Sequence, residues 1–155
     1  MKTKKAAQNA SQKDAISFLK KDHREVEKAF EQFENLADGK IAAKKKLADE
    51  ITEELLKHMA IEEEKFYPAV KEGIKDLEDA VNEGIVEHAG AKELIEQIQK
   101  MKGDEELFDS KVHVLSEQIE HHVEEEETEM FPKVEKSSLD LEALGQEMAK
   151  RKANL

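Results

Sequence analysis

Apolar residues recur at steps of three and four along most of the chain, which is the period of an amphipathic α-helix. The first stripe follows Asp14, a favourable N-cap, and its members are Ile16, Leu19, Val26, Phe30 and Phe33. It predicts a helix that ends near Ala37, because Gly39 follows and supplies a stop. Position 23 lies on the same stripe and should face the core, but it holds His23.

The second stripe predicts a helix from about Lys40 to Tyr67, ended by Pro68, because proline interrupts the hydrogen bonds of a helix. Two of its core-facing positions hold His58 and Glu62. The other members of the stripe are Leu47, Ile51, Leu55 and Phe66.

The third stripe predicts a helix from about Lys75 to Met101, with Gly103 as its stop. His88 occupies one of its core-facing positions. The apolar members are Leu77, Val81, Ile85, Ala91, Ile95 and Ile98.

The fourth stripe predicts a helix that follows Asp104, as N-cap, and runs to about Phe131, ended by Pro132. Its core-facing polar residues are His122 and Glu126. The apolar members are Val112, Leu115, Ile119 and Met130.

The two ends of the chain differ in character. Residues 1–13 lack an apolar stripe and are expected to be a flexible N-terminal tail. A last helix is expected from about Ser138, with Leu141, Leu144 and Met148 as an apolar edge that docks on the other helices. The folded domain should therefore span residues 14–152.

The four long stripes form a repeat of two helix pairs. His23 and His88 are 65 positions apart, and His58 and His122 are 64 apart. After His58 and again after His122, a Glu follows at the fourth position and a Pro, preceded by an aromatic residue, at the tenth. Two similar αα-hairpins related by a pseudo-twofold axis predict an all-α fold, an antiparallel up-down-up-down four-helix bundle with a short extra C-terminal helix.

Composition argues against several classes of function and of binding site. With 25 Lys and Arg against 37 Asp and Glu, the formal net charge of −12 argues against binding to nucleic acid or to anionic membranes. The absence of Cys excludes disulfides and thiolate metal sites. No apolar run approaches the ~20 residues of a membrane span, and no signal peptide is recognisable, so a cytoplasmic location is expected.

Polar residues at core-facing positions need a shared reason, since burying an unpaired carboxylate costs several kcal/mol. A metal centre is such a reason, because it neutralises carboxylates and orients imidazoles. The predicted ligands, which suit iron, manganese or zinc, are His23, His58, Glu62, His88, His122 and Glu126. The remaining candidates lie off the stripes and are expected at the surface. For Glu27 and His121 the alternative is a role in supporting a ligand. These candidates are His113, His121, Glu27, Glu63, Glu64, Glu124, Glu125 and Glu127.

Four His and two Glu on four helices, with His-x-x-x-Glu and aromatic-Pro occurring twice, resemble the hemerythrin-like HHE cation-binding domains. The resemblance extends over residues 14–152 and includes the pairs Asp22-His23 and Glu87-His88. It implies a non-haem di-iron centre with an oxo or hydroxo bridge, and makes manganese or zinc less expected. By position, Glu62 and Glu126 would bridge two iron ions and the four His would be terminal ligands.

One position departs from the oxygen-carrying hemerythrins, which have a further His four residues after the equivalent of His88, where this chain has Lys92. The departure favours a protein that binds, senses or reacts with O2, NO or peroxide over reversible oxygen transport. An enzyme that decomposes peroxide or reduces NO at the same centre is the alternative, and a metal-free helical interaction module is the third possibility. No protein partner is indicated.

Small residues surround His88. Gly84 and Gly90 each cost about 1 kcal/mol relative to Ala inside a helix, so their presence needs a reason. Close helix packing is one reason. Our hypothesis is that this side of the helix leaves room for O2, NO or peroxide to reach the metals.

Overall fold

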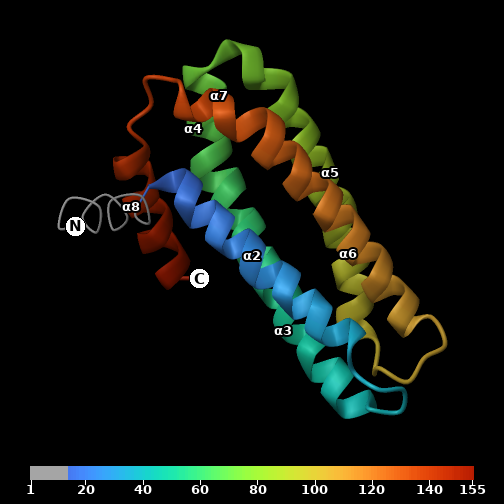
Figure 1. Cartoon of the computed structure of the whole chain (residues 1–155). Coiled ribbons are helices and arrows are strands. Elements are labelled where there is room, and N and C mark those ends of the chain that lie inside the picture. The colour runs from blue at the N-terminus through green and yellow to red at the C-terminus, as the bar shows by residue number, and fades with distance from the viewer. Residues whose placement is uncertain (1–13) are drawn as a thin grey trace.

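Two antiparallel helical hairpins lie against each other and form the body of the protein (Figure 1). The computed structural model describes residues 14–155, so the expected tail at residues 1–13 lies outside the described residues. Successive long helices run in opposite directions, which confirms the predicted all-helical bundle. The long helices are α2 (Ala15–Glu34), α3 (Ile41–Ile61), α5 (Glu78–Lys100) and α6 (Phe108–Glu125).

The second and fourth helices continue past their prolines. A π-helix, η1 (Glu62–Phe66), joins α3 to α4 (Tyr67–Gly73), and a second, η3 (Glu126–Met130), joins α6 to α7 (Phe131–Glu135). The prediction that the prolines end these helices was therefore wrong. Each π-turn resets the hydrogen-bond register just before the proline, which then lies in the first turn of a new α-segment, where its missing N–H is tolerated.

The π-turns also change which side chains face the core. The Tyr67 N–H donates to the Glu62 carbonyl, and the Phe131 N–H donates to the Glu126 carbonyl. In an α-helix, residues five apart differ by about 140° around the axis, whereas the wider π-turn brings them over one another. Consecutive large residues are buried in consequence: Phe66 with Tyr67, and Met130 with Phe131.

The helix start agrees with the sequence prediction at α2 and differs at α5, α6 and the last helix. Asp14 accepts a hydrogen bond from the Ser17 N–H at 2.8 Å, which confirms it as the N-cap of α2. Asp104 does not cap α6, which starts only at Phe108. The Glu105 carboxylate instead accepts hydrogen bonds from backbone N–H groups just before it, so these bonds stay within the loop. A short 3₁₀ turn, η2 (Lys75–Leu77), precedes α5.

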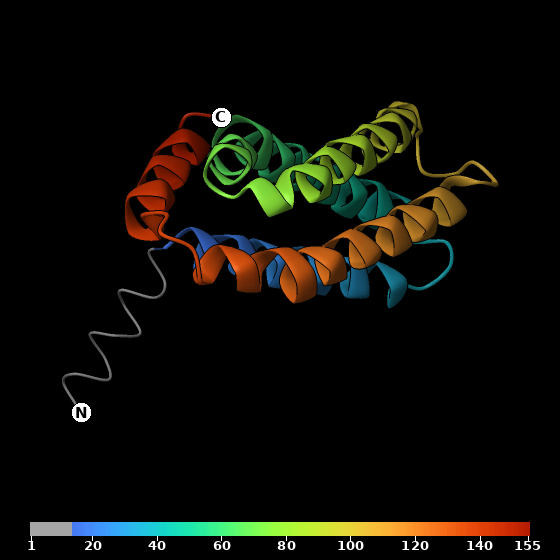
Figure 2. The same cartoon turned by 90° about the horizontal axis from the view of Figure 1, so that it is seen from above.

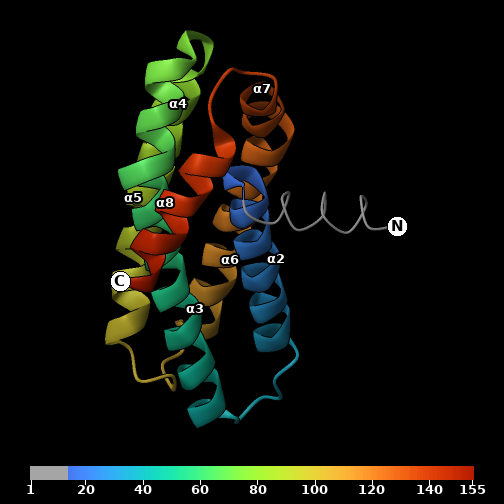
Figure 3. The same cartoon turned by 90° about the vertical axis from the view of Figure 1, so that its left-hand side faces the viewer.

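The last helix, α8 (Leu141–Ala153), begins after Asp140, whose carboxylate accepts from the Ala143 N–H at 3.0 Å. It starts a few residues later than the predicted Ser138. The helix packs against α2, α3 and η1 and buries Leu144 and Met148. Figure 3 shows α8 lying over α2 and α3, and Figure 2 shows it at the end of the molecule away from the α2–α3 and α5–α6 loops.

The apolar core is divided into two clusters. One is built around Phe30, Ile51, Ile95 and Leu115, near the α2–α3 and α5–α6 loops, and the other around Leu19, Phe66, Phe131 and Met148, under α8. The four core-facing His and two core-facing Glu are buried but belong to neither cluster.

The predicted third stripe was wrong at Ile85. This side chain is 39% exposed, whereas the neighbouring Gly84 is buried. In the part of the chain that the structure describes, no helix is both long and apolar enough to cross a bilayer.

Candidate metal centre

The structure brings all six predicted ligands together. Each comes from a different element, and none is more than 6% exposed. The six are His23 of α2, His58 of α3, Glu62 of η1, His88 of α5, His122 of α6 and Glu126 of η3.

The imidazoles form two pairs, one in each hairpin. The rings of His23 and His58 have centroids 4.9 Å apart, and those of His88 and His122 are 4.8 Å apart. All four turn Nε2 inward, and the Nε2 atoms of His88 and His122 are 3.2 Å apart. The site thus has two halves that follow the sequence repeat.

Glu126 joins the two halves. Its Oε1 lies 3.2 Å from Nε2 of His23, and its Oε2 lies 3.2 Å from Nε2 of His122. Glu62 also joins the two halves, but through a single oxygen. Its Oε1 lies 3.3 Å from Nε2 of His58 and 3.1 Å from Nε2 of His88. Each carboxylate therefore contacts an imidazole from each hairpin.

A carboxylate also holds the outer nitrogen of every imidazole. The residue before the first His of each hairpin binds the second His: Asp22 Oδ2 lies 3.0 Å from Nδ1 of His58, and Glu87 Oε1 lies 2.7 Å from Nδ1 of His122. Such contacts fix the orientation of the ring and leave Nε2 free to act as a ligand.

The other two outer carboxylates cross between the hairpins. Glu63 lies 2.8 Å from Nδ1 of His88, and Glu127 lies 2.6 Å from Nδ1 of His23. The expectation that both are surface charges was wrong. The repeat contained the signal that would have found them, because each directly follows one of the two buried glutamates.

Cations lie outside three of the four outer carboxylates. Lys152 Nζ lies 2.8 Å from Asp22, Lys92 Nζ lies 2.8 Å from Glu63, and Arg24 binds Glu127. Lys92, at the position where oxygen carriers have a further His, therefore supports an outer carboxylate. The fourth outer carboxylate, Glu87, has no Lys or Arg partner within residues 14–155.

The donor atoms of the centre fit a metal. Four buried side-chain atoms lack a hydrogen-bond partner although they face one another: Nε2 of His23, Nε2 of His58, Oε2 of Glu62 and Oε1 of Glu126. Buried polar atoms are normally paired, so four orphaned atoms in one layer indicate a missing partner. Ligand atoms from the six residues form two overlapping groups close enough to hold an ion, and Glu62 belongs to both.

Charges inside the centre shift its pKa values strongly. Burial alone lowers the pKa of His58, but the carboxylates of Glu62 and Asp22 outweigh it and raise the pKa to about 10. Burial also lowers the pKa of His122, but the carboxylates of Glu126 and Glu62 outweigh burial and raise this pKa to about 12. The pKa of Glu62 falls well below its usual value because the imidazoles outweigh its burial. Without metal, His58 and His122 therefore carry protons that balance the charge of the carboxylates.

Tyr67 is a site residue that the sequence reading missed, since it was assigned only to the end of a helix. Its hydroxyl donates to Glu126 Oε2 at 2.5 Å and lies 3.2 Å from Nε2 of His122. Burial and the two central glutamates raise its pKa well above the usual value, so the phenol keeps its proton. The ring stacks on His88, as Phe131 stacks on His23 at the equivalent place in the repeat.

Gly84 makes room for this phenol. A Cβ at position 84 would lie 2.8 Å from the Tyr67 hydroxyl oxygen and 3.1 Å from Cζ. A Cβ at Gly90 would have no neighbour within 4 Å. The two glycines therefore have different causes, close packing at Gly84 and an open surface at Gly90.

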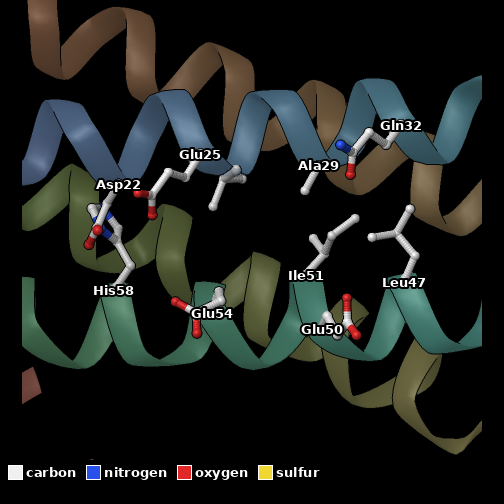
Figure 4. Close-up of a pocket in the computed structure, with 10 residues that line it drawn as sticks. Asp22, Glu25, Ala29, Gln32, Leu47, Glu50, Ile51, Glu54 and His58 are labelled. Atoms are coloured by element: carbon white, nitrogen blue, oxygen red, sulfur yellow. The ribbon is translucent and has the colours of Figure 1, made fainter. Parts of the chain in front are cut away.

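Three hollows surround the histidines. A small cavity of about 20 Å³ lies among the four His and Asp22, and the rest of its wall is apolar: Val26, Leu55, Met59, Ile119 and Val123. A groove of about 220 Å³ between α2 and α3 reaches Asp22 and His58 over an apolar floor (Figure 4). A groove of about 210 Å³ between α5 and α6 reaches His88 and His122 beside Gly90.

The two remaining histidines are at the surface. The His113 side chain is 58% exposed and pairs with Glu34 at 3.0 Å. The His121 side chain is 67% exposed and lies 3.0 Å from Glu125. Neither contacts the six central residues.

Comparisons with known proteins agree with this geometry. Residues 14–134 match the family model described as the Hemerythrin HHE cation binding domain. A crystal structure of a hemerythrin HHE cation-binding domain-containing protein from Mycobacterium kansasii has a TM-score of 0.77 and 23% identity, covering 91% of this chain and 86% of that chain. At that identity the likeness shows the fold alone. A comparison with curated proteins found no match.

We predict that Gly84→Ala is less stable than Gly90→Ala by about 1–3 kcal/mol, measured by urea unfolding. Both changes gain the same helix propensity, about 1 kcal/mol, so their difference isolates the clash with Tyr67. Equal unfolding free energies would show that the phenol moves aside without cost.

Proposed function

Because this chain belongs to the hemerythrin HHE cation-binding domain family, we propose that it is a non-haem di-iron protein whose centre binds, senses or reacts with O2, NO or peroxide. The observation that carries the proposal is the span of the two buried carboxylates, each of which contacts an imidazole from each hairpin. A pair of metal ions, one in each half, would satisfy the orphaned donor atoms of both halves. Iron rather than manganese or zinc rests on the family resemblance, since the donor types suit all three.

The six ligands divide naturally. His23 and His58 would serve one iron ion, His88 and His122 the other, and the two glutamates both. The four outer carboxylates hold the imidazoles in place through Nδ1, which raises their basicity as ligands. We extend the domain through α8, to residue 152, because Lys152 binds the outer carboxylate Asp22.

The surroundings of the centre suit a small, weakly polar reactant. Bound iron would supply electrons to, or a binding position for, a small oxidant or diatomic gas. The cavity among the four His has an apolar wall and, at about 20 Å³, is too small for an organic substrate. On its other side, the Tyr67 hydroxyl offers a proton held at a buried position near His88 and His122. These features favour reaction with a gas or peroxide.

His58→Ala should lose at least half of the iron that the wild-type chain binds, because it removes a proposed ligand together with the imidazole that Asp22 orients. Metal analysis after expression with iron measures this. His113→Ala is the matched control, since that imidazole is exposed and distant from the centre. Unchanged iron in the His58 variant, or no iron in the wild type, would refute the assignment and favour a metal-free interaction module.

Removal of iron should lower the melting temperature, and the deficit should grow between about pH 7 and 9.5. In metal-free protein the pKa of His58 is raised to about 10, above the ~6.5 of an unfolded chain. Its stabilising charge is therefore complete below about pH 6.5 and is lost as pH rises through the folded pKa. Equal melting temperatures with and without iron at both pH values would contradict this.

Gly90→Leu should slow the reaction of the reduced, iron-loaded protein with O2, NO or peroxide several-fold while leaving the iron content intact. A side chain at position 90 would extend into the groove between α5 and α6 that reaches His88 and His122. Stopped-flow absorbance measures the rate. Val86→Leu is the control, because Val86 is 71% exposed on the same helix and does not line the groove. An unchanged rate for Gly90→Leu would remove this route.

The enzymatic alternative is decided by the same reagents. Sustained turnover of peroxide or NO would identify an enzyme, whereas a single stoichiometric reaction would identify a sensor or store. Anaerobic iron titration followed by exposure to O2, NO and peroxide in turn makes the distinction.

A further inference from the structure

The two halves of the centre are alike inside but differ outside. On one side α8 packs over α2, α3 and η1, and its Lys152 pairs with Asp22. The counterpart of Asp22 in the repeat is Glu87, which holds His122 in the same way but has no basic partner in residues 14–155. Figure 1 shows α5 and α6 on the side of the bundle away from α8. The α5–α6 face of the centre is therefore uncapped.

A narrow acidic pocket lies on this uncapped face. Its volume is about 30 Å³, which is room for about one water molecule or one metal ion. Glu83 and Glu87 of α5 face Glu125 of α6 and Glu129 of η3 across it. Within residues 14–155, none of these four carboxylates forms an ion pair with Lys or Arg.

The carboxylates crowd one another. His121 lies beside them, with its Nε2 3.0 Å from Glu125. Glu87, His121 and Glu125 each offer one ligand atom, and these atoms lie within 4.8 Å of one another. A divalent cation would relieve the repulsion and find nitrogen and oxygen donors ready.

The pocket leads to the centre. His122 and Glu126 also line it, and both are buried, whereas Glu83 and Glu129 are exposed. The Glu126 side chain is 3% exposed, and its Oε1 has no hydrogen-bond partner. A buried carboxylate with one oxygen that lacks a hydrogen bond thus lies behind a surface cluster of carboxylates, and ligands line the way from solvent to the centre.

We propose that this pocket binds a divalent cation on its way to the centre, where Glu126 and His122 receive it. In the protein's own function this cation is Fe²⁺. The inference rests on the proposed metal centre and adds the path by which the metal arrives. The pocket is narrow, and the four carboxylates that face one another across it have no Lys or Arg partner within residues 14–155. The larger groove between α2 and α3 is also lined by carboxylates, but there Lys152 Nζ lies 2.8 Å from Asp22 and 3.7 Å from Glu54. Cations and small neutral reactants would then reach the centre by different paths.

The test compares anaerobic Fe²⁺ uptake by metal-free wild type with that of the double variant Glu125→Gln/Glu129→Gln. Neither residue contacts the four central His, so the final iron content should stay at the wild-type level while the uptake rate falls about tenfold. Uptake is followed by quenching with a chelator at set times and measuring protein-bound iron. Glu120→Gln/Glu124→Gln is the matched control, because it removes the same charge from exposed positions on α6 that do not line the pocket.

Four outcomes are distinct. Slow uptake with full final content in the pocket variant alone supports the path. Uptake by the pocket variant as fast as by the wild type overturns the path and leaves the proposed centre intact. Equal slowing of both variants overturns the path in favour of general attraction by the acidic surface. Wild type that binds no iron overturns the proposed centre and the path together.

Discussion

The contact between buried carboxylates and imidazoles is the interaction on which the structure depends. Glu62 and Glu126 lie in a layer between two apolar clusters, where an isolated charge would cost several kcal/mol. Four imidazoles surround them, and each imidazole is held from outside by a further carboxylate. Each buried glutamate is thus positioned by imidazoles, and each imidazole is positioned by carboxylates. The orphaned atoms at its middle are the part that the protein alone does not satisfy.

The helices deviate from α geometry where this layer demands it. Both buried glutamates begin a π-turn, and the residue five positions later, Tyr67 or Phe131, comes to lie over an imidazole. In an uninterrupted α-helix that residue would face away from the centre. The following proline is compatible with the new register, so the aromatic-Pro pair marks a turn that reshapes the site and does not end the helix. The π-turn is what places a phenol within reach of Glu126.

The sequence was sufficient to predict the His and Glu residues at the middle of the site. It was insufficient to predict the carboxylates that hold the imidazoles from outside. His58 and Glu62 interrupt an apolar stripe, and such interruptions are visible because a core position tolerates polarity only for a reason. Glu63 and Glu127 lie among other exposed-looking glutamates, so composition hid them, although their places in the repeat are equivalent. Tyr67 was misjudged because a π-turn alters the helical period on which a stripe is counted. Ile85 was misjudged because the neighbouring Gly84, packed against the distant Tyr67 phenol, takes the buried position instead. Tertiary contacts of this kind leave no periodic trace.

The departures from the pseudo-twofold explain how similar halves acquire different tasks. Phe131 and Tyr67 occupy equivalent places, but only the half with His88 and His122 has a hydroxyl beside it. Helix α8 packs over the other half and Lys152 pairs with Asp22 there, whereas the hydroxyl-bearing half faces the acidic pocket. A symmetric duplication would surround both pairs of imidazoles in the same way. The added hydroxyl, the absence of a Lys or Arg partner at Glu87 within residues 14–155 and the helix over one face give the two halves of the proposed centre different surroundings, with a proton donor and an acidic pocket on the same side.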